Sequence, residues 1–198
     1  MTLIERAKAV CLSPDSEWTT IAGEHAEAAA LITGYVLPLA GLAAAAQLIG
    51  ATLIGRNLGI IGTYRVPLMT GIGIAVASLA FAAVGVVVMS FVIDALAPTF
   101  GAQKSREQAL KVAVYSATPV WIAGVVQIIP ALGILVLLGA LYALYLLYLG
   151  LPRLMKCPAE KTVAYLGAVI ACAIVIGLVG STLIASIGAV NVAAAVVQ

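Results

Sequence analysis

Six polar side chains stand within or at the edges of long apolar runs, and they are the residues of this sequence best placed for chemistry. They are Asp94, Lys111, Tyr115, Thr118, Tyr142 and Tyr145. An ionised carboxylate costs several kcal/mol in lipid, so a charged residue in such a run needs a partner or a route to water. We therefore treat the six as a candidate binding cluster.

Asp94 lies about one turn before the end of its apolar run, and two partners are expected at matching depth. These are the ammonium of Lys111 and the hydroxyl of Tyr115. With either partner, Asp94 would form a proton or cation site. Alternatively it belongs to a structural pair or reaches the interface, which fits a lone carboxylate because a single acid makes a poor relay.

Tyrosines repeat at every third position from Tyr142 through Tyr145 to Tyr148, which places them on a slowly rotating stripe of one helix. The hydroxyls of the first two need acceptors. Thr118, the carbonyl freed by Pro119 and Asp94 are the expected acceptors. This predicts a polar cluster in the cytoplasmic half of a helical bundle. Such a cluster would line a groove for a lipid headgroup or small solute, or simply hold the helices together.

No catalytic site, metal site or cofactor is predicted, because the sequence has no nucleophile beside a base, no HExxH and no paired carboxylates. Cys11, Cys157 and Cys172 have no CxxC spacing or histidine partner, so they are expected to be reduced and structural. His25 is a lone histidine in an acidic segment. The amides Gln47, Gln127 and Asn191 are expected near outer span ends, either bonding helix to helix or marking the interface.

The composition is that of an integral membrane protein. Of 198 residues, 64% are hydrophobic and only 9% are charged, whereas soluble domains average about 45–50% and about 25%. The net charge of +2 provides no basic patch for nucleic acid. The lipid bilayer is therefore the expected partner, and nucleic acid is not.

Five apolar segments approach or exceed the ~20 residues that a helix needs to cross a bilayer. They cover about 28–54, 66–97, 109–129, 131–151 and 162–190, so residues 28–198 are expected to form one all-α transmembrane bundle. Pro38 and Pro119 should kink their helices. Gly177, Ser181 and Ala185 recur every four residues, which is typical of a helix-packing stripe.

Residues 1–27 are expected to form a short cytoplasmic or interfacial segment. Apolar residues of 2–12 gather on one helical face, which predicts an amphipathic helix lying in the interface; a frayed soluble tail is the alternative. Ser13, Pro14 and Asp15 then provide a helix cap, a proline for the first turn and a favourable acid. Trp18 and Ile21 would face the headgroups.

The lysines and arginines predict the orientation, since cytoplasmic segments carry an excess of them. With the N-terminus in the cytoplasm and the C-terminus in the periplasm, only Arg56 and Arg65 lie outside. The remaining cations then all lie on the cytoplasmic side: Arg6, Lys8, Lys104, Arg106, Lys111, Arg153, Lys156 and Lys161.

Three short motifs stand out: Ser13-Pro14 to Trp18, Tyr115-Ser-Ala-Thr-Pro119, and Leu141-Tyr142 through Tyr148-Leu149-Gly150 followed by Pro158 and Lys161. Together they resemble the Yip family of Ypt/Rab-GTPase-interacting membrane proteins, in its bacterial branch. The resemblance runs from about Val10 into the last span. It implies a five-span bundle with a cytoplasmic N-terminal region and no enzymatic activity. Eukaryotic members are linked to vesicle traffic, small-GTPase binding and self-association, but here the N-terminal region is only about 27 residues long.

The sequence therefore favours a non-enzymatic protein of the bacterial inner membrane that acts in membrane organisation or as a scaffold. It is expected to form homo-oligomers through its small-residue faces and to meet protein partners at the cytoplasmic face. The alternative is a transporter or lipid-moving protein that uses the polar cluster around Asp94.

Overall fold

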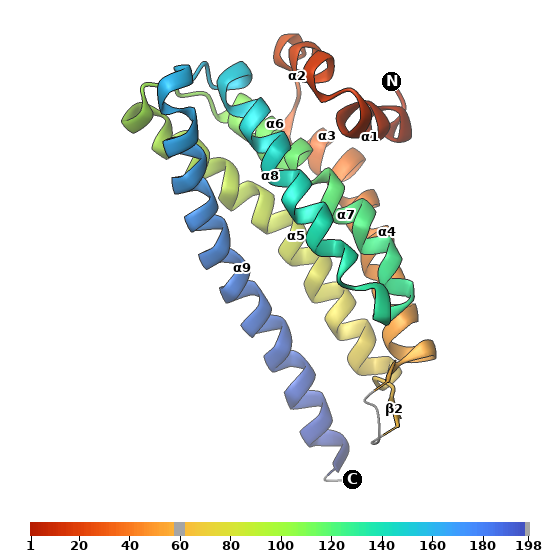
Figure 1. Ribbon diagram of the computed structural model, residues 1–198. Helices are drawn as coiled ribbons and strands as arrows, with labels where there is room; N and C mark the ends of the chain where they lie inside the picture. The colour runs from red at the N-terminus through yellow and green to blue at the C-terminus, as the bar shows by residue number, and fades with distance from the viewer. Residues whose placement is uncertain (58–61, 197–198) are drawn as a thin grey trace.

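The computed structural model describes residues 1–57 and 62–196, with side chains for residues 1–55 and 62–186. This part of the chain is almost entirely helical and forms one elongated bundle (Figure 1). Five segments are long and apolar enough to cross a membrane, which confirms the all-α, five-span prediction. They are Ala28–Ile54, Leu68–Phe100, Arg106–Ile128, Pro130–Leu154 and Ala159–Ser186.

Several spans combine α-helix with short turns of tighter or wider winding. The first comprises α3 (Ala28–Leu31), the π-helical η1 (Ile32–Val36), α4 (Leu37–Ile49) and the π-helical η2 (Gly50–Ile54). The second comprises α5 (Leu68–Leu96) and the 3₁₀ turn η4 (Ala97–Phe100). The third comprises α6 (Arg106–Ser116), α7 (Thr118–Gly124) and η5 (Val125–Ile128), and the fourth η6 (Pro130–Leu132) and α8 (Leu135–Leu154). The last is α9 (Ala159–Val196).

Both prolines predicted to kink helices stand where the winding changes. Pro38 lies in the first turn of α4, directly after η1, and Pro119 lies in the first turn of α7, after α6 has ended at Ser116. At the second break the backbone amides of Val120 and Trp121 both donate to the carbonyl of Ala117. Proline has no amide hydrogen and its ring collides with the preceding turn, so it removes a helical hydrogen bond and favours a kink or break.

The third span is the centre of the bundle. In an apolar stretch of 18 residues of this span, 67% of the residues are buried, whereas in the corresponding stretches of the fourth and fifth spans 11% are buried. α7 packs tightly on α8 because Gly139 has no side chain there. A methyl group at Gly139 would lie 2.7 Å from both the carbonyl oxygen of Pro119 and the side chain of Ala123.

The two ends of the bundle differ (Figure 1). One end carries α1 (Leu3–Leu12) and α2 (Pro14–Gly23), two short helices that lie across it; we call these helices the platform and this end the platform end. The opposite end carries a small antiparallel pairing of β1 (Arg56–Asn57) with β2 (Thr63–Tyr64); we call it the hairpin end. α9 runs from the platform end to the hairpin end.

The predicted helix restart at Pro14 is present, but the predicted exposure of the next turns is wrong. α1 is held by a reciprocal cap between Thr2 and Glu5, and α2 begins with Pro14 in its first turn. Trp18 and Ile21 do not face headgroups, since they are 1% and 0% exposed. The reason is local: Gly150 of α8 has no side chain, and a methyl group there would lie 3.0 Å from the Trp18 ring.

Candidate functional site

Lys111 lies at the platform end and does not pair with Asp94. Its side chain is 1% exposed, and its ammonium donates to the backbone carbonyls of Ile21, at 3.1 Å, and Glu24. It also lies 3.3 Å from a carboxylate oxygen of Glu107 on the preceding turn. Carbonyls at the end of a helix have no partner within the helix, so a buried lysine satisfies them well. Lys111 therefore fastens the end of α2 to α6.

Tyr115 does not pair with Asp94 either, and its ring packs against other residues. Its ring meets Tyr35 edge-on at 5.0 Å between centroids and Trp18 at 6.4 Å. The guanidinium of Arg6 lies over the same ring, 5.8 Å from its centroid. This geometry favours a cation–π contact. Tyr115 thus joins the platform to the first and third spans.

The other hydroxyls of the predicted cluster bond to separate places. Thr118 shares a buried hydrogen bond of 2.9 Å with Tyr35. Tyr142 donates to the backbone carbonyl of Cys11 at 2.7 Å. Tyr145 stacks at a tilt on Tyr142, with ring centroids 5.6 Å apart, and is 44% exposed. The structure does not bring these residues around Asp94 as one polar groove.

Asp94 is buried elsewhere, where α5 packs on α9. It is 3% exposed, and its Oδ1 has no hydrogen-bond partner in the described part of the chain. The hydroxyl of Tyr165 donates to the carbonyl of the preceding residue, Ile93. Ser90, one turn earlier, uses its hydroxyl on Val87. Buried polar atoms are nearly always satisfied, which makes this oxygen an exception that needs an explanation.

An ion-pair network that sequence reasoning missed locks the platform together. Arg6 contacts Glu17 and also binds both carboxylate oxygens of Glu24, at 2.5 and 2.7 Å. The side chains of Arg6 and Glu17 are 11% and 10% exposed. Burial lowers the pKa of Arg6, but the hydrogen bonding and charge of Glu24 and Glu17 outweigh this effect and raise it. Opposite charges on two short helices joined at Pro14 were the signal available in the sequence.

Glu107 and Asp15 tie the platform region to the spans in two further places. Glu107 accepts from the backbone amide of Ala26 at 2.9 Å and lies 3.1 Å from Nδ1 of His25. The lone histidine, 86% exposed, is thus a surface partner of this carboxylate. Asp15 pairs with Arg153 of α8 at 2.5 Å, but both side chains contact solvent. An exposed pair of this kind contributes little.

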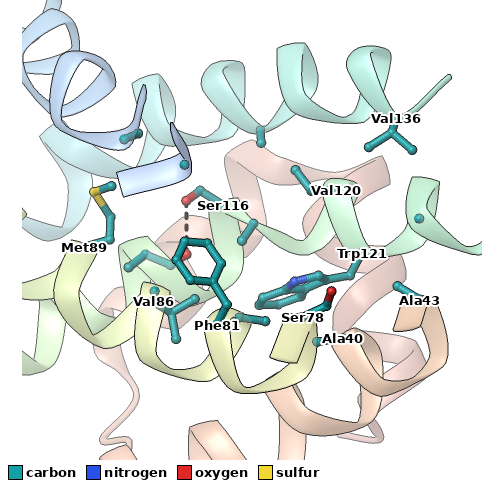
Figure 2. A pocket seen from close by; sticks show the side chains of 18 of the residues that line it. Ala40, Ala43, Ser78, Phe81, Val86, Met89, Ser116, Val120, Trp121 and Val136 are labelled. Atoms are coloured by element: carbon teal, nitrogen blue, oxygen red, sulfur yellow. Dashed lines mark hydrogen bonds between the residues drawn. The ribbon is translucent and has the colours of Figure 1, made fainter. Parts of the chain in front are cut away.

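One feature that the sequence did not predict is an apolar cavity of about 470 Å³ between the helices of the bundle. Figure 2 shows Phe81 of α5 and Trp121 of α7 pointing into it, with Val120 and Val136 farther along. α4, α6, α8 and α9 complete its walls. The hydroxyl of Ser116 bonds to the carbonyl of Ala113 in its own helix, so it adds little polarity to the lining.

The predicted packing stripe of α9 has no contact with another helix of the described chain at its small residues. Gly177, Ser181 and Ala185 are exposed, and a methyl group at Gly177 would meet nothing within 4 Å. The small residue that contacts α5 is instead Gly180, where a methyl group would overlap the ring of Phe81. The stripe therefore lies on an exposed side of α9, with Gly177 at the edge of the cavity described above.

The remaining candidates are placed as follows. Gln47 and Gln127 are half-buried and line the cavity, while the side chain of Asn191 lies outside the described residues. Among the described residues, no three His, Cys, Asp or Glu side chains come together as metal ligands. The three cysteines are free.

Comparison with known proteins gives one family. The family model for the Yip1 domain matches residues 8–181. The chain is also similar to "Inner membrane protein YohC" of Escherichia coli strain K12, with 29% identity over 166 residues, which covers 82% of this chain and 85% of the relative. The same protein of Escherichia coli O6:H1 matches with the same identity and coverage. No solved structure matches significantly.

Proposed function

This chain belongs to the Yip1 domain family, and from that premise we propose that it is a non-enzymatic scaffold of the inner membrane. It acts in membrane organisation by associating with copies of itself within the bilayer and with partner proteins at the platform end. The location is carried over from the name of the Escherichia coli relative, an inner membrane protein. The protein is an integral membrane protein with five apolar helices of spanning length.

The observation that supports this role most is how the platform uses its polar groups. Arg6 binds Glu17 and Glu24, Lys111 binds two backbone carbonyls, and Tyr142 binds a third. These groups hold α1 and α2 against the spans, so they do not line an open polar route. A fixed surface at a membrane boundary is what a scaffold presents to a partner.

Self-association would use the outward face of α9. The stripe Gly177, Ser181 and Ala185 leaves room for the backbone of a second helix to approach closely, which is how helices associate in lipid. Its neighbour Thr182 provides a matched control, because Ser181 and Thr182 are both exposed and both bond their hydroxyls to the carbonyl three residues earlier, at 2.9 and 2.8 Å.

The experiment compares Ser181→Ile with Thr182→Ile in proteoliposomes, with labelled protein at increasing dilution in lipid. Energy transfer between copies should fall for Ser181→Ile, because the branched side chain blocks close approach. It should stay at the wild-type level for Thr182→Ile. Wild-type protein that is monomeric at every dilution would refute self-association.

The proposed orientation places the platform in the cytoplasm and the C-terminus in the periplasm. It rests on the distribution of lysine and arginine. Reporter tags on Met1 and Gln198 should be accessible from opposite sides of the membrane. Accessibility from the same side would contradict both the orientation and the odd number of spans.

A second candidate function, transport or lipid movement, is favoured by Asp94 alone. Its carboxylate is buried with one oxygen unpartnered in the described part of the chain. If Asp94 carries protons or cations, Asp94→Asn should abolish flux in proteoliposomes while insertion and association persist. If Asp94 is structural, the same change should lower the thermal stability in detergent and leave flux untouched.

A further inference from the structure

The cavity in the bundle lies among the membrane-spanning segments. It is lined by residues of α4, α5, α6, α7, α8 and α9, all of which belong to the membrane-spanning segments. Its wall reaches the lipid-facing surface at α9, since Gly177 belongs both to the lining and to the exposed face of that helix. The cavity therefore opens toward the bilayer.

The size and lining of the cavity decide between three occupants. Water has few partners over most of the cavity, because the lining is mainly apolar and its polar side chains are Gln47, Ser78, Ser116 and Gln127. A helix of a second copy would fit for only about one turn. One turn, about 10 Å across and 5.4 Å long, fills ~420 Å³, and the volume of the cavity is about 470 Å³. A hydrocarbon chain is slender and flexible. It fits both the volume, which lies within the ~300–1,000 Å³ typical of ligand pockets, and the apolar walls.

The hairpin end of the cavity supplies a polar group where a lipid needs one. Gln47 lines the main cavity and also a second cavity of about 370 Å³ between α4, α5 and the segment around Tyr64. Tyr64 is 48% exposed at the hairpin end. A carboxamide donates hydrogen bonds, and an ester carbonyl accepts them. The two cavities share Gln47 and lead from an exposed rim into a mainly apolar interior, which Gln127 also lines.

We propose that this cavity binds an acyl chain of a membrane phospholipid, with the ester region of the lipid beside Gln47. The chain enters between α9 and the other spans and lies against Phe81 and Trp121. This site does not depend on self-association, and its test is separate because it detects contact between a lipid chain and Trp121, not contact between copies of the protein.

Trp121 provides the reporter. It lines the cavity and is only 8% exposed, so lipid outside the bundle has little access to its ring. The other tryptophan, Trp18, is buried in the platform. Purified protein is reconstituted in phosphatidylcholine with brominated or ordinary chains, because bromine quenches tryptophan fluorescence only on close contact. Comparing the wild type with Trp121→Phe separates the signal of Trp121 without altering Trp18.

The expected result is that brominated chains remove most of the fluorescence of Trp121 and little of that of Trp18. Ala173→Leu, which fills the cavity from α9, should restore the fluorescence. Ala171→Leu, on the exposed side of the same helix, should not. In native mass spectrometry, Ala173→Leu should also lose the phospholipid that the wild type and Ala171→Leu retain.

Two outcomes would overturn the proposal. One is unquenched Trp121 in folded wild-type protein surrounded by brominated lipid. The other is equal quenching and equal lipid retention in the Ala173→Leu and Ala171→Leu variants, which would mean that the lipid lies against the outside of the bundle. If Ala173→Leu does not fold, Ala143→Leu fills the same cavity from α8 and replaces it.

Discussion

Replacing Arg6 by methionine should release the platform from the bundle end. The change keeps most of the side-chain volume but leaves Glu17, which is 8% exposed, as an uncompensated buried charge. Removing one partner of a buried pair costs about 3–5 kcal/mol. Glu24 is 40% exposed at its side chain and contributes little. We therefore expect the lower end of that range, ~3 kcal/mol.

Hydrogen exchange of the amides in α1 and α2 measures this directly. Each 1.36 kcal/mol is about a tenfold change in an equilibrium, so their opening should become about 100-fold more frequent. Arg153→Met is the matched control, because Arg153 pairs with Asp15 with side chains 31% and 67% exposed. Loss of an exposed pair costs about 0–1 kcal/mol, so in Arg153→Met the platform should open less than about tenfold more often than in the wild type.

The double variant Arg6→Met with Glu17→Met tests the physical reason. Replacing both partners of a buried pair by apolar side chains of similar volume is often neutral, so exchange should return most of the way to the wild-type rate. The reasoning is refuted if the double variant exchanges as fast as Arg6→Met. It is also refuted if Arg153→Met opens the platform as much as Arg6→Met does.

Two further predictions concern single side chains. Thr118→Val leaves the buried hydroxyl of Tyr35 without its partner and should lower the stability in detergent by about 1 kcal/mol. The double variant Thr118→Val with Tyr35→Phe should lose less stability, because no buried hydroxyl is left unpaired. An equal loss of stability in the single and double variants would contradict this reason. Burial raises the pKa of the Cys11 thiol, so less of it is thiolate at neutral pH. Iodoacetamide should modify Cys11 more slowly than an introduced cysteine at the exposed Leu12 in Leu12→Cys, with the gap narrowing as the pH rises; equal rates at neutral pH would disprove the effect.

The spans were predictable because hydropathy and proline are properties of the local chain. An apolar run of spanning length can satisfy its backbone in lipid only as a helix, and Pro119 removes one of its hydrogen bonds wherever the other helices lie. The restart of the chain at Pro14 follows from the same kind of local rule. None of these features depends on which residues meet across the bundle.

The partners of polar side chains were not predictable because they depend on rotation and docking. Lys111 and Asp94 have matching depth in the sequence, yet Lys111 turns to the end of α2, which docks on α6. Likewise Gly177 and Gly180 differ by three residues on α9, and only the rotation of the helix decides that Gly180 meets Phe81. The cavity was even less predictable from the sequence, because it is the space that side chains from six helices leave unfilled.

The seat of the platform also sets the order in which this protein can be completed. α1 and α2 precede in the chain the groups that receive them: Tyr142 binds the carbonyl of Cys11, and Gly150 accommodates Trp18. These two helices therefore cannot reach their final place until the fourth span has been synthesised. Until then, the surfaces of α1 and α2 that meet α8 stay uncovered.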